Sequence, residues 1–346
     1  LTVIVLFIVA IALLPKLIPL FFRMWKAVRP KRRPRPPVQH QLKKPDYHGF
    51  EYGKVRPERE RIWKKARELF KAKKFKELDE WAEKLIKSRQ RDREGRLSMR
   101  SLYNQVDHYH VGSINGEKPP MAPDVLAKMW YEERPNSSFA HVVRIRQLVN
   151  KAWKARGSGY SSTVTKEGWT IFEKHLREAK KIFDHGAKQD FEDPLFYHSF
   201  ASIARGLSLP DAERIKWFKK GVELEPLYYT NYQSESGTRM PRWGGSAEDV
   251  ANFAKKWSDN VGGDDGDIVY FWIVDRQRSY FRMRSIVSCD RIPLDMKRFE
   301  KGCRALIKKH PCFENYSTVG LWAVWMKNRP LAKECFEKIG KQYPYQ

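Results

Sequence analysis

The sequence has few cysteines, and their spacing fits neither a metal site nor a disulfide framework. Four occur among 346 residues, all in the last sixth of the chain: Cys289, Cys303, Cys312 and Cys335. No two are close enough to form the short ligand pairs of a zinc site. Small disulfide-stabilised secreted domains are therefore excluded. We expect a reducing compartment in which these residues are small buried hydrophobes.

Acidic residues are also scarce, because 41 Asp and Glu face 67 Lys and Arg and leave a formal net charge of +26. Residues 1–45 hold ten of the basic side chains and no acidic one, so the rest of the chain keeps 57 basic against 41 acidic residues. A positive field of this kind attracts nucleic acid, acidic proteins or a membrane surface. The sequence contains no aromatic-basic binding motif that would choose among them.

One long apolar run stands at the start of the sequence. Residues 1–22 carry a single charge, at Lys16. As a helix they would extend roughly 33 Å, which is enough to span a bilayer. A cleaved signal peptide is the alternative, but the run has no basic segment ahead of its apolar core. We therefore expect a retained, single-pass transmembrane helix.

A basic, proline-rich linker is predicted over residues 23–56. By the positive-inside tendency it would lie on the cytoplasmic side of the inner (cytoplasmic) membrane, with the N-terminus outside and the soluble domain in the cytoplasm. The side chains expected to lie at the lipid bilayer and its anionic headgroups are Lys16, Arg23, Trp25, Lys26, Arg29, Lys31, Arg32, Arg33 and Arg35. A dedicated lipid, nucleic-acid or partner site is the alternative to an ordinary stop-transfer flank.

The rest of the sequence shows almost no strand alternation and many amphipathic runs of helical period. Apolar residues broken by short turns predict helical hairpins over 61–86, 195–224 and 316–343. In the second hairpin, Asp211 follows Pro210 and is a candidate N-cap. Further helices are expected over 142–153, 171–183, 250–257 and 296–307, and the run 268–274 fits a buried helix or a strand equally well.

These patterns predict an all-α fold. An irregular array of helical hairpins, resembling tetratricopeptide repeats, is expected to follow one N-terminal transmembrane helix. The domains expected are a helical domain over 57–290 and C-terminal helices over 291–346. The last hairpin carries the likeness: in LWAVWMKNRPLAKECFEKIGKQYP, small and aromatic residues occupy packing positions and a proline closes the second helix. No clean 34-residue period runs through the chain, so regular solenoid geometry is not expected.

A second resemblance rests on the segments FKAKKFKELDEW, AWKARGSGYSSTV and PRWGGSAEDVANFA. With them the chain is similar, from about Trp63 to about Arg284, to an uncharacterised bacterial family whose domain has no known function. The element Pro-Arg-Trp-Gly-Gly-Ser is its most specific part. The resemblance implies one mostly helical, repeat-related domain, and it brings no activity, cofactor or catalytic residue.

Two glycine-containing loops are candidate binding sites. In the first, Arg156, Gly157, Ser158, Gly159 and Tyr160 resemble a phosphate-cradling turn. The spacing of a P-loop is missing, however, and a glycine that caps the preceding helix explains the turn more simply.

In the second loop, Ser246 is a predicted N-cap, with Arg242, Trp243, Gly244 and Gly245 before it. A Trp that packs the loop is favoured over a ligand platform.

Other clusters give no strong site. The pair of histidines in 107–110 lacks a completing set of metal ligands, and surface or packing roles are favoured. The acidic stretch 262–267 fails the EF-hand template and is interpreted as a solvated turn. No metal, cofactor or catalytic residue is predicted.

The favoured function is a non-catalytic, membrane-anchored scaffold or accessory subunit of a membrane protein complex that binds protein partners through its hairpins. One alternative is a membrane-associated enzyme built on the two glycine loops. The other is a tethered binder of nucleic acid or another anionic polymer.

We expect the mature protein to stay in the membrane fraction with residues 1–22 intact, because that run is long and apolar enough to be retained in lipid. Fractionation followed by N-terminal sequencing tests this. A freely soluble protein from which the run has been clipped would contradict it.

Overall fold

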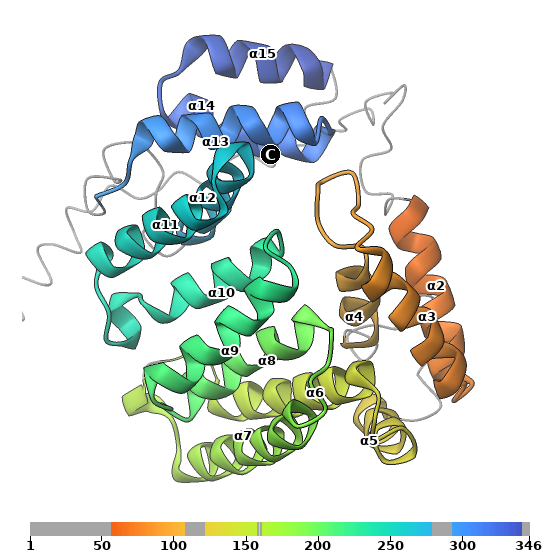
Figure 1. Ribbon diagram of the computed structural model, residues 1–346. Coiled ribbons are helices and arrows are strands. Elements are labelled where there is room, and N and C mark those ends of the chain that lie inside the picture. Colours follow the sequence, from red (N-terminus) through yellow and green to blue (C-terminus); the bar gives the residue numbers. More distant parts are fainter. Residues whose placement is uncertain (1–56, 108–121, 158, 160, 279–292, 341–346) are drawn as a thin grey trace, which may run out of the picture. The chain divides into compact units, whose positions relative to one another are not determined.

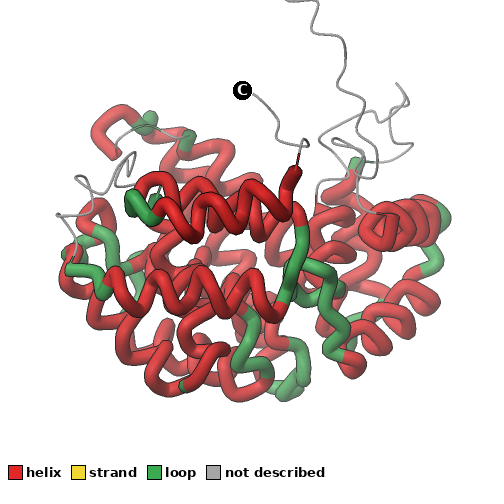
Figure 2. The backbone as a smooth tube through the Cα atoms, turned by 90° about the horizontal axis from the view of Figure 1, so that it is seen from above, coloured by secondary structure: helices red, strands yellow, loops and turns green. Residues whose placement is uncertain are grey.

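The computed structural model describes residues 57–107, 122–157, 159, 161–278 and 293–340. Over these residues the regular structure consists of fourteen α-helices and two short 3₁₀ helices, with one isolated antiparallel bridge between Arg91 and Leu97 (Figure 2). The predicted all-α class is therefore confirmed for the described part. The predicted membrane helix and linker, residues 1–56, lie outside it. No helix of the described part has the length and apolarity to cross a bilayer.

The first seven described helices share one hydrophobic cluster (Figure 1). They are α2 (Pro57–Lys71), α3 (Phe75–Ser88), α4 (Met99–Asp107), α5 (Pro123–Glu133), α6 (Ser138–Arg156), α7 (Lys166–Ala187) and α8 (Pro194–Gly206). Aromatic rings fill much of its centre. Phe183 of α7 stacks on Phe196 of α8 with ring centroids 4.7 Å apart, so α8 completes the core that α6 and α7 begin.

The following helices build a second cluster of buried residues. They are α9 (Asp211–Leu224), α10 (Tyr229–Thr238), α11 (Ala247–Val261), α12 (Gly263–Gln277), α13 (Met296–Lys309), α14 (Phe313–Trp325) and α15 (Arg329–Ile339). Helix α9 belongs to both clusters, because Trp217 packs against the first and Phe218 is buried in the second. The predicted boundary near residue 290 lies outside the described residues, and buried residues from before and after it join in this one cluster.

The three predicted hairpins are present as α2–α3, α8–α9 and α14–α15, and each helix pair is in contact. Helix α3 shows why: Phe75, Leu78, Ala82 and Ile86 recur at helical spacing and are all buried. In the last hairpin, the side chain of Asn328 accepts a hydrogen bond from the N–H of Leu331 and caps α15. The turn there thus forms where the sequence predicts it.

The ambiguous run 268–274 is helical and lies in α12. All seven of its residues are buried, since α12 packs against α10, α11 and α13. A helix surrounded in this way needs no polar face, which explains why its sequence carries no amphipathic period.

Two local predictions were wrong. Asp211 is not an N-cap: Pro210 occupies the cap position, and Asp211 is the first helical residue, where it accepts a hydrogen bond from Arg214. The acidic stretch 262–267 is not a solvated turn, because α12 begins at Gly263. The backbone of Gly262, with φ +75°, reverses the chain there, and Gly266 packs so closely that an added Cβ would lie 2.2 Å from the carbonyl oxygen of Ser258.

A buried histidine on α6, His141, contacts the exposed His185 on α7. His141 Nδ1 lies 2.9 Å from the carbonyl oxygen of Ser137, and its Nε2 lies 3.3 Å from Nδ1 of His185 on a stacked ring. Burial, with a smaller contribution from His185, lowers the pKa of His141 from 6.5 to about 4. At pH values between about 4 and 6.5, His141 is therefore neutral in the folded protein and partly or mostly protonated in the unfolded chain.

We expect the free energy of unfolding to fall as the pH is lowered from 6.5 toward 4, because the unfolded state binds the extra proton there. One such group contributes a slope of up to about 1.4 kcal/mol per pH unit. Urea unfolding at a series of pH values should give a shallower slope for His141→Gln than for the wild type. Lys128→Gln, on an exposed face of α5, is the control, and equal slopes for His141→Gln and this control would refute the assignment.

Candidate functional site

The two predicted glycine loops meet in space through their tryptophans. Trp153, near the end of α6, lies edge-on to Trp243 of the 3₁₀ helix η3 (Pro241–Trp243), with ring centroids 5.9 Å apart. The guanidinium of Arg205 lies 5.5 Å from the first ring centroid and 5.2 Å from the second. A cation that contacts two aromatic faces contributes on the order of 1 kcal/mol, so this contact binds the loops to α8.

The first loop is a helix end. Gly157 has φ +71° and caps α6, and its N–H donates to the carbonyl oxygen of Trp153 at 3.0 Å. Arg156 folds back over its own turn, where it donates to the carbonyl oxygens of Gly157 at 3.1 Å and Gly159 at 2.8 Å. The capping interpretation is therefore confirmed. Ser158 and Tyr160 lie outside the described residues.

The second loop is set by its glycines and its cap. Gly244 has φ +88° and ends η3, while Gly245 approaches the backbone of Arg239. The Ser246 hydroxyl accepts from the N–H of Asp249, and the Asp249 carboxylate accepts from the N–H of Ser246, which forms a capping box. The predicted N-cap is confirmed. The structure does not describe the side chain of Arg242.

A basic site that the sequence analysis did not single out lies between the first and second hydrophobic clusters. We call it the arginine cluster; it consists of Arg59 on α2, Arg96 in the loop before α4, Arg100 on α4 and Arg146 on α6. The loop that carries Arg96 is held by the Arg91–Leu97 bridge and by Gly95, which has φ +80°. The carboxylate of Asp92 accepts from the N–H groups of Glu94 and Arg96 and stiffens the turn.

Three of the four arginines have partners within this site. Arg59 pairs with Asp92 at 2.9 Å, Arg96 Nε lies 3.2 Å from a carboxylate oxygen of Glu94, and Arg146 donates to Asn104 Oδ1 at 3.2 Å. Arg100 forms no ion pair and no side-chain hydrogen bond with any residue of the described part. It is the member of the cluster whose charge this part of the chain leaves without a counter-ion.

The pKa of Arg100 is lowered, chiefly by burial; Tyr228 opposes this effect, and Arg96, Arg146 and Arg59 each add a smaller decrease. Burial also lowers the pKa of Arg96. A guanidinium stays protonated at every physiological pH. Arg100 therefore keeps its positive charge, and the free-energy cost of removing that charge from water is not offset. A buried charge without a partner costs several kcal/mol, and an anion placed beside it would recover part of that cost.

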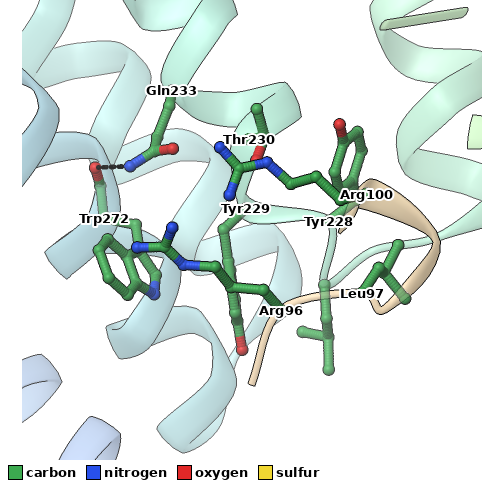
Figure 3. Close-up of a pocket in the computed structure, with 9 residues that line it drawn as sticks. Arg96, Leu97, Arg100, Tyr228, Tyr229, Thr230, Gln233 and Trp272 are labelled. Atoms are coloured by element: carbon green, nitrogen blue, oxygen red, sulfur yellow. Dashed lines mark hydrogen bonds between the residues drawn. The ribbon is translucent and has the colours of Figure 1, made fainter. Parts of the chain in front are cut away.

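Figure 3 shows Arg96 and Arg100 extending in the same direction toward Gln233 and Trp272. Together with Tyr228 they line a narrow cavity of about 10 Å³. Arg96 lies over the Trp272 ring with its guanidinium carbon 4.8 Å from the centroid, and Gln233 Nε2 donates to the carbonyl oxygen of Trp272 at 3.1 Å. The guanidinium of Arg96 is thus held in a fixed direction, as recognition of a carboxylate or phosphate oxygen requires.

A second small cavity, of about 40 Å³, adjoins the first, because Arg96 and Arg100 line both. Its polar wall also contains Arg59, Trp63, Ser101, Asn104 and the carboxylate of Asp92. The chemistry that this arrangement offers is donation of hydrogen bonds to an anion, since guanidinium groups do not act as acid or base near neutral pH.

A signal for this site exists in the sequence. The stretch RQRDREGRLSMR, residues 89–100, contains five arginines in twelve positions. Its density marks it as basic, but the approach of Arg59 and Arg146 from distant helices depends on the fold.

A family model for a domain of unknown function (DUF4034) matches residues 63–181. The match covers α3 to α6 with most of α2 and α7, and it includes Arg96, Arg100 and Arg146. The Pro-Arg-Trp-Gly-Gly-Ser segment lies beyond it. No curated protein and no solved structure matches the chain at a significant level.

We expect Gly245→Ala to destabilise the fold by at least about 2 kcal/mol, because the added Cβ would lie 2.0 Å from the carbonyl oxygen of Arg239 and the backbone would have to move. Gly237→Ala is the matched control: no atom lies within 4 Å of its added Cβ, and Ala favours the helix by up to about 1 kcal/mol. Urea unfolding measures both, and equal stabilities of the two variants would show that the loop does not need the close approach.

Proposed function

We propose that the protein is a membrane-tethered, non-catalytic binding protein, an accessory subunit or scaffold of a membrane complex, which docks an acidic segment of a partner protein at the arginine cluster. The observation that carries the proposal is the half-buried Arg100 guanidinium, which lacks a counter-ion in the described part of the chain. Natural interiors seldom keep such a charge without a function, since removing it would stabilise the fold.

The surroundings of Arg100 favour binding over chemistry. Arg96 beside it is fixed by stacking on Trp272, and Gln233 is oriented by its own hydrogen bond, so the donors are in place before a ligand arrives. Guanidinium groups positioned in this way recognise a carboxylate through two parallel hydrogen bonds. The net positive charge of the chain would steer an acidic partner toward the site.

The apolar run 1–22 supplies the tether in this proposal. Confining the helical array to the membrane surface raises its effective concentration toward other membrane components without any new contact. The alternative of an enzyme built on the two glycine loops has less support, because those loops meet through tryptophan rings and a guanidinium, which hold structure together and do not transfer protons.

We expect Arg100→Gln to weaken capture of the acidic partner by roughly 10- to 100-fold, since a charge-assisted hydrogen bond contributes about 1.5–3 kcal/mol. The full chain is purified in mild detergent from cells that carry either form, and the recovered partners are quantified. Lys128→Gln changes the charge equally on an exposed face of α5 and should leave capture unchanged.

The same variant separates a functional from a structural role. If Arg100 is retained for binding, Arg100→Gln keeps or raises the free energy of unfolding, because it removes an unpaired buried charge. Loss of more than about 2 kcal/mol of stability, or undiminished partner capture, would overturn the proposal. Co-purification of nuclease-sensitive polymer, with affinity falling steeply in salt, would favour the nucleic-acid alternative instead.

A further inference from the structure

A larger cavity lies between α6 and α8. Its volume is about 190 Å³, and a water molecule needs only about 10–15 Å³ on the same scale. Its polar lining consists of Arg146 and Asn150 from α6 and of His198, Ser199 and Ser202 from α8. The exposed side chain of Asn150 lies at the rim, so the cavity can be reached from solvent.

The polar groups converge because of helical spacing. Arg146 and Asn150 are four residues apart on α6, as are His198 and Ser202 on α8, and residues four apart share one face of a helix. The two faces are turned toward one another across the cavity. A ligand inside would thus meet a guanidinium and an amide from one helix and an imidazole and a hydroxyl from the other.

The imidazole of His198 forms part of the cavity wall. Its Nδ1 is buried and has no hydrogen-bond partner in the described part of the chain. The ring packs edge-on against Tyr228 with centroids 5.4 Å apart, which fixes its orientation. This nitrogen is shielded from water and does not open into the cavity, so a ligand there would meet other atoms of the ring.

The electrostatic potential in the cavity is positive. Burial has the largest effect on the pKa of His198 and the positive charges of Arg146 and Arg100 come next, and together they lower it to about 3. The ring is therefore neutral, and its lowered pKa reflects the cations around it. A nearby carboxylate, Asp193 at the start of α8, is already engaged, since it accepts hydrogen bonds from Tyr103 and from the N–H of Leu195. An anion would therefore be attracted into the cavity.

From the cavity and the polar side chains that converge on it from two helices, we propose that the space between α6 and α8 binds a phosphate-class oxyanion, either free phosphate or the phosphoryl group of a larger molecule. A carboxylate presents two oxygens in one plane. Phosphate presents its oxygens in tetrahedral directions, which suits donors that approach from two helices, and a guanidinium fork binds two of them at once. This cavity shares no lining residue with the Arg96–Arg100 cavity, although Arg146 also belongs to the arginine cluster, and the inference does not depend on a protein partner.

Inorganic phosphate is titrated into the full-length protein in detergent at constant ionic strength, with acetate as the competing class, and binding is followed by calorimetry and by ³¹P NMR. We expect saturable binding of phosphate at least about tenfold tighter than that of acetate. Arg146→Gln should weaken it by roughly 10- to 100-fold, as expected for the loss of a charge-assisted hydrogen bond. Lys154→Gln, an equal charge change at an exposed position of α6, is the control.

A second set of measurements identifies the source of the phosphoryl group. Short-chain phosphatidic acid that binds more tightly than inorganic phosphate, and competes with it, indicates a lipid headgroup; equal affinities indicate the free anion. Arg146→Lys, which keeps the charge but loses the guanidinium fork, should fall between the wild type and Arg146→Gln.

Absence of saturable phosphate binding to the wild-type protein would overturn the inference, as would equal binding by Arg146→Gln and the control. Arg100→Gln distinguishes this site from the partner site. It should reduce phosphate affinity only a few-fold, through the loss of a distant charge, while it weakens partner capture by roughly 10- to 100-fold.

Discussion

Desolvation of arginine is the constraint on which the interior of this protein depends. Most buried or half-buried guanidinium groups in the described helices meet a carboxylate or an aromatic ring, as Arg214 does with Glu235 and Arg205 with Trp153 and Trp243. These contacts hold neighbouring helices in register, because each cation fixes the positions of its partners. Arg100 is an exception to this pattern, and it lies where helices of both hydrophobic clusters meet.

The sequence was sufficient for the helical hairpins, since their apolar residues recur at a period that local structure alone imposes. The sequence was not sufficient to assign residues 268–274 of α12 to a helix, because these residues are all buried and show no polar face of helical period. It also misjudged 262–267, because the tight reversal at Gly262 and the close packing of Gly266 depend on α11 lying alongside. The open choice over 268–274 and the wrong prediction for 262–267 share one cause, because tertiary contacts decide both structures.

The candidate site could be predicted only in part. Five arginines in 89–100 indicate a basic loop. The sequence alone does not show which of them form ion pairs with nearby carboxylates. Which of them lacks a partner is decided by Arg59 and Arg146, brought from helices more than thirty residues away in either direction. By contrast, Ser246 and Gly157 were predicted correctly, because a helix cap is determined by its immediate neighbours.

The stack of Phe183 on Phe196 has a consequence for how the chain divides. The stretch that matches the domain of unknown function stops at residue 181, two positions before Phe183 and well before α8. A fragment cut at that limit would leave the inner faces of α6 and α7 open to water, with the ring of Phe196 missing from the centre of their core. The stretch defined by sequence likeness is therefore smaller than the hydrophobic core to which its helices belong.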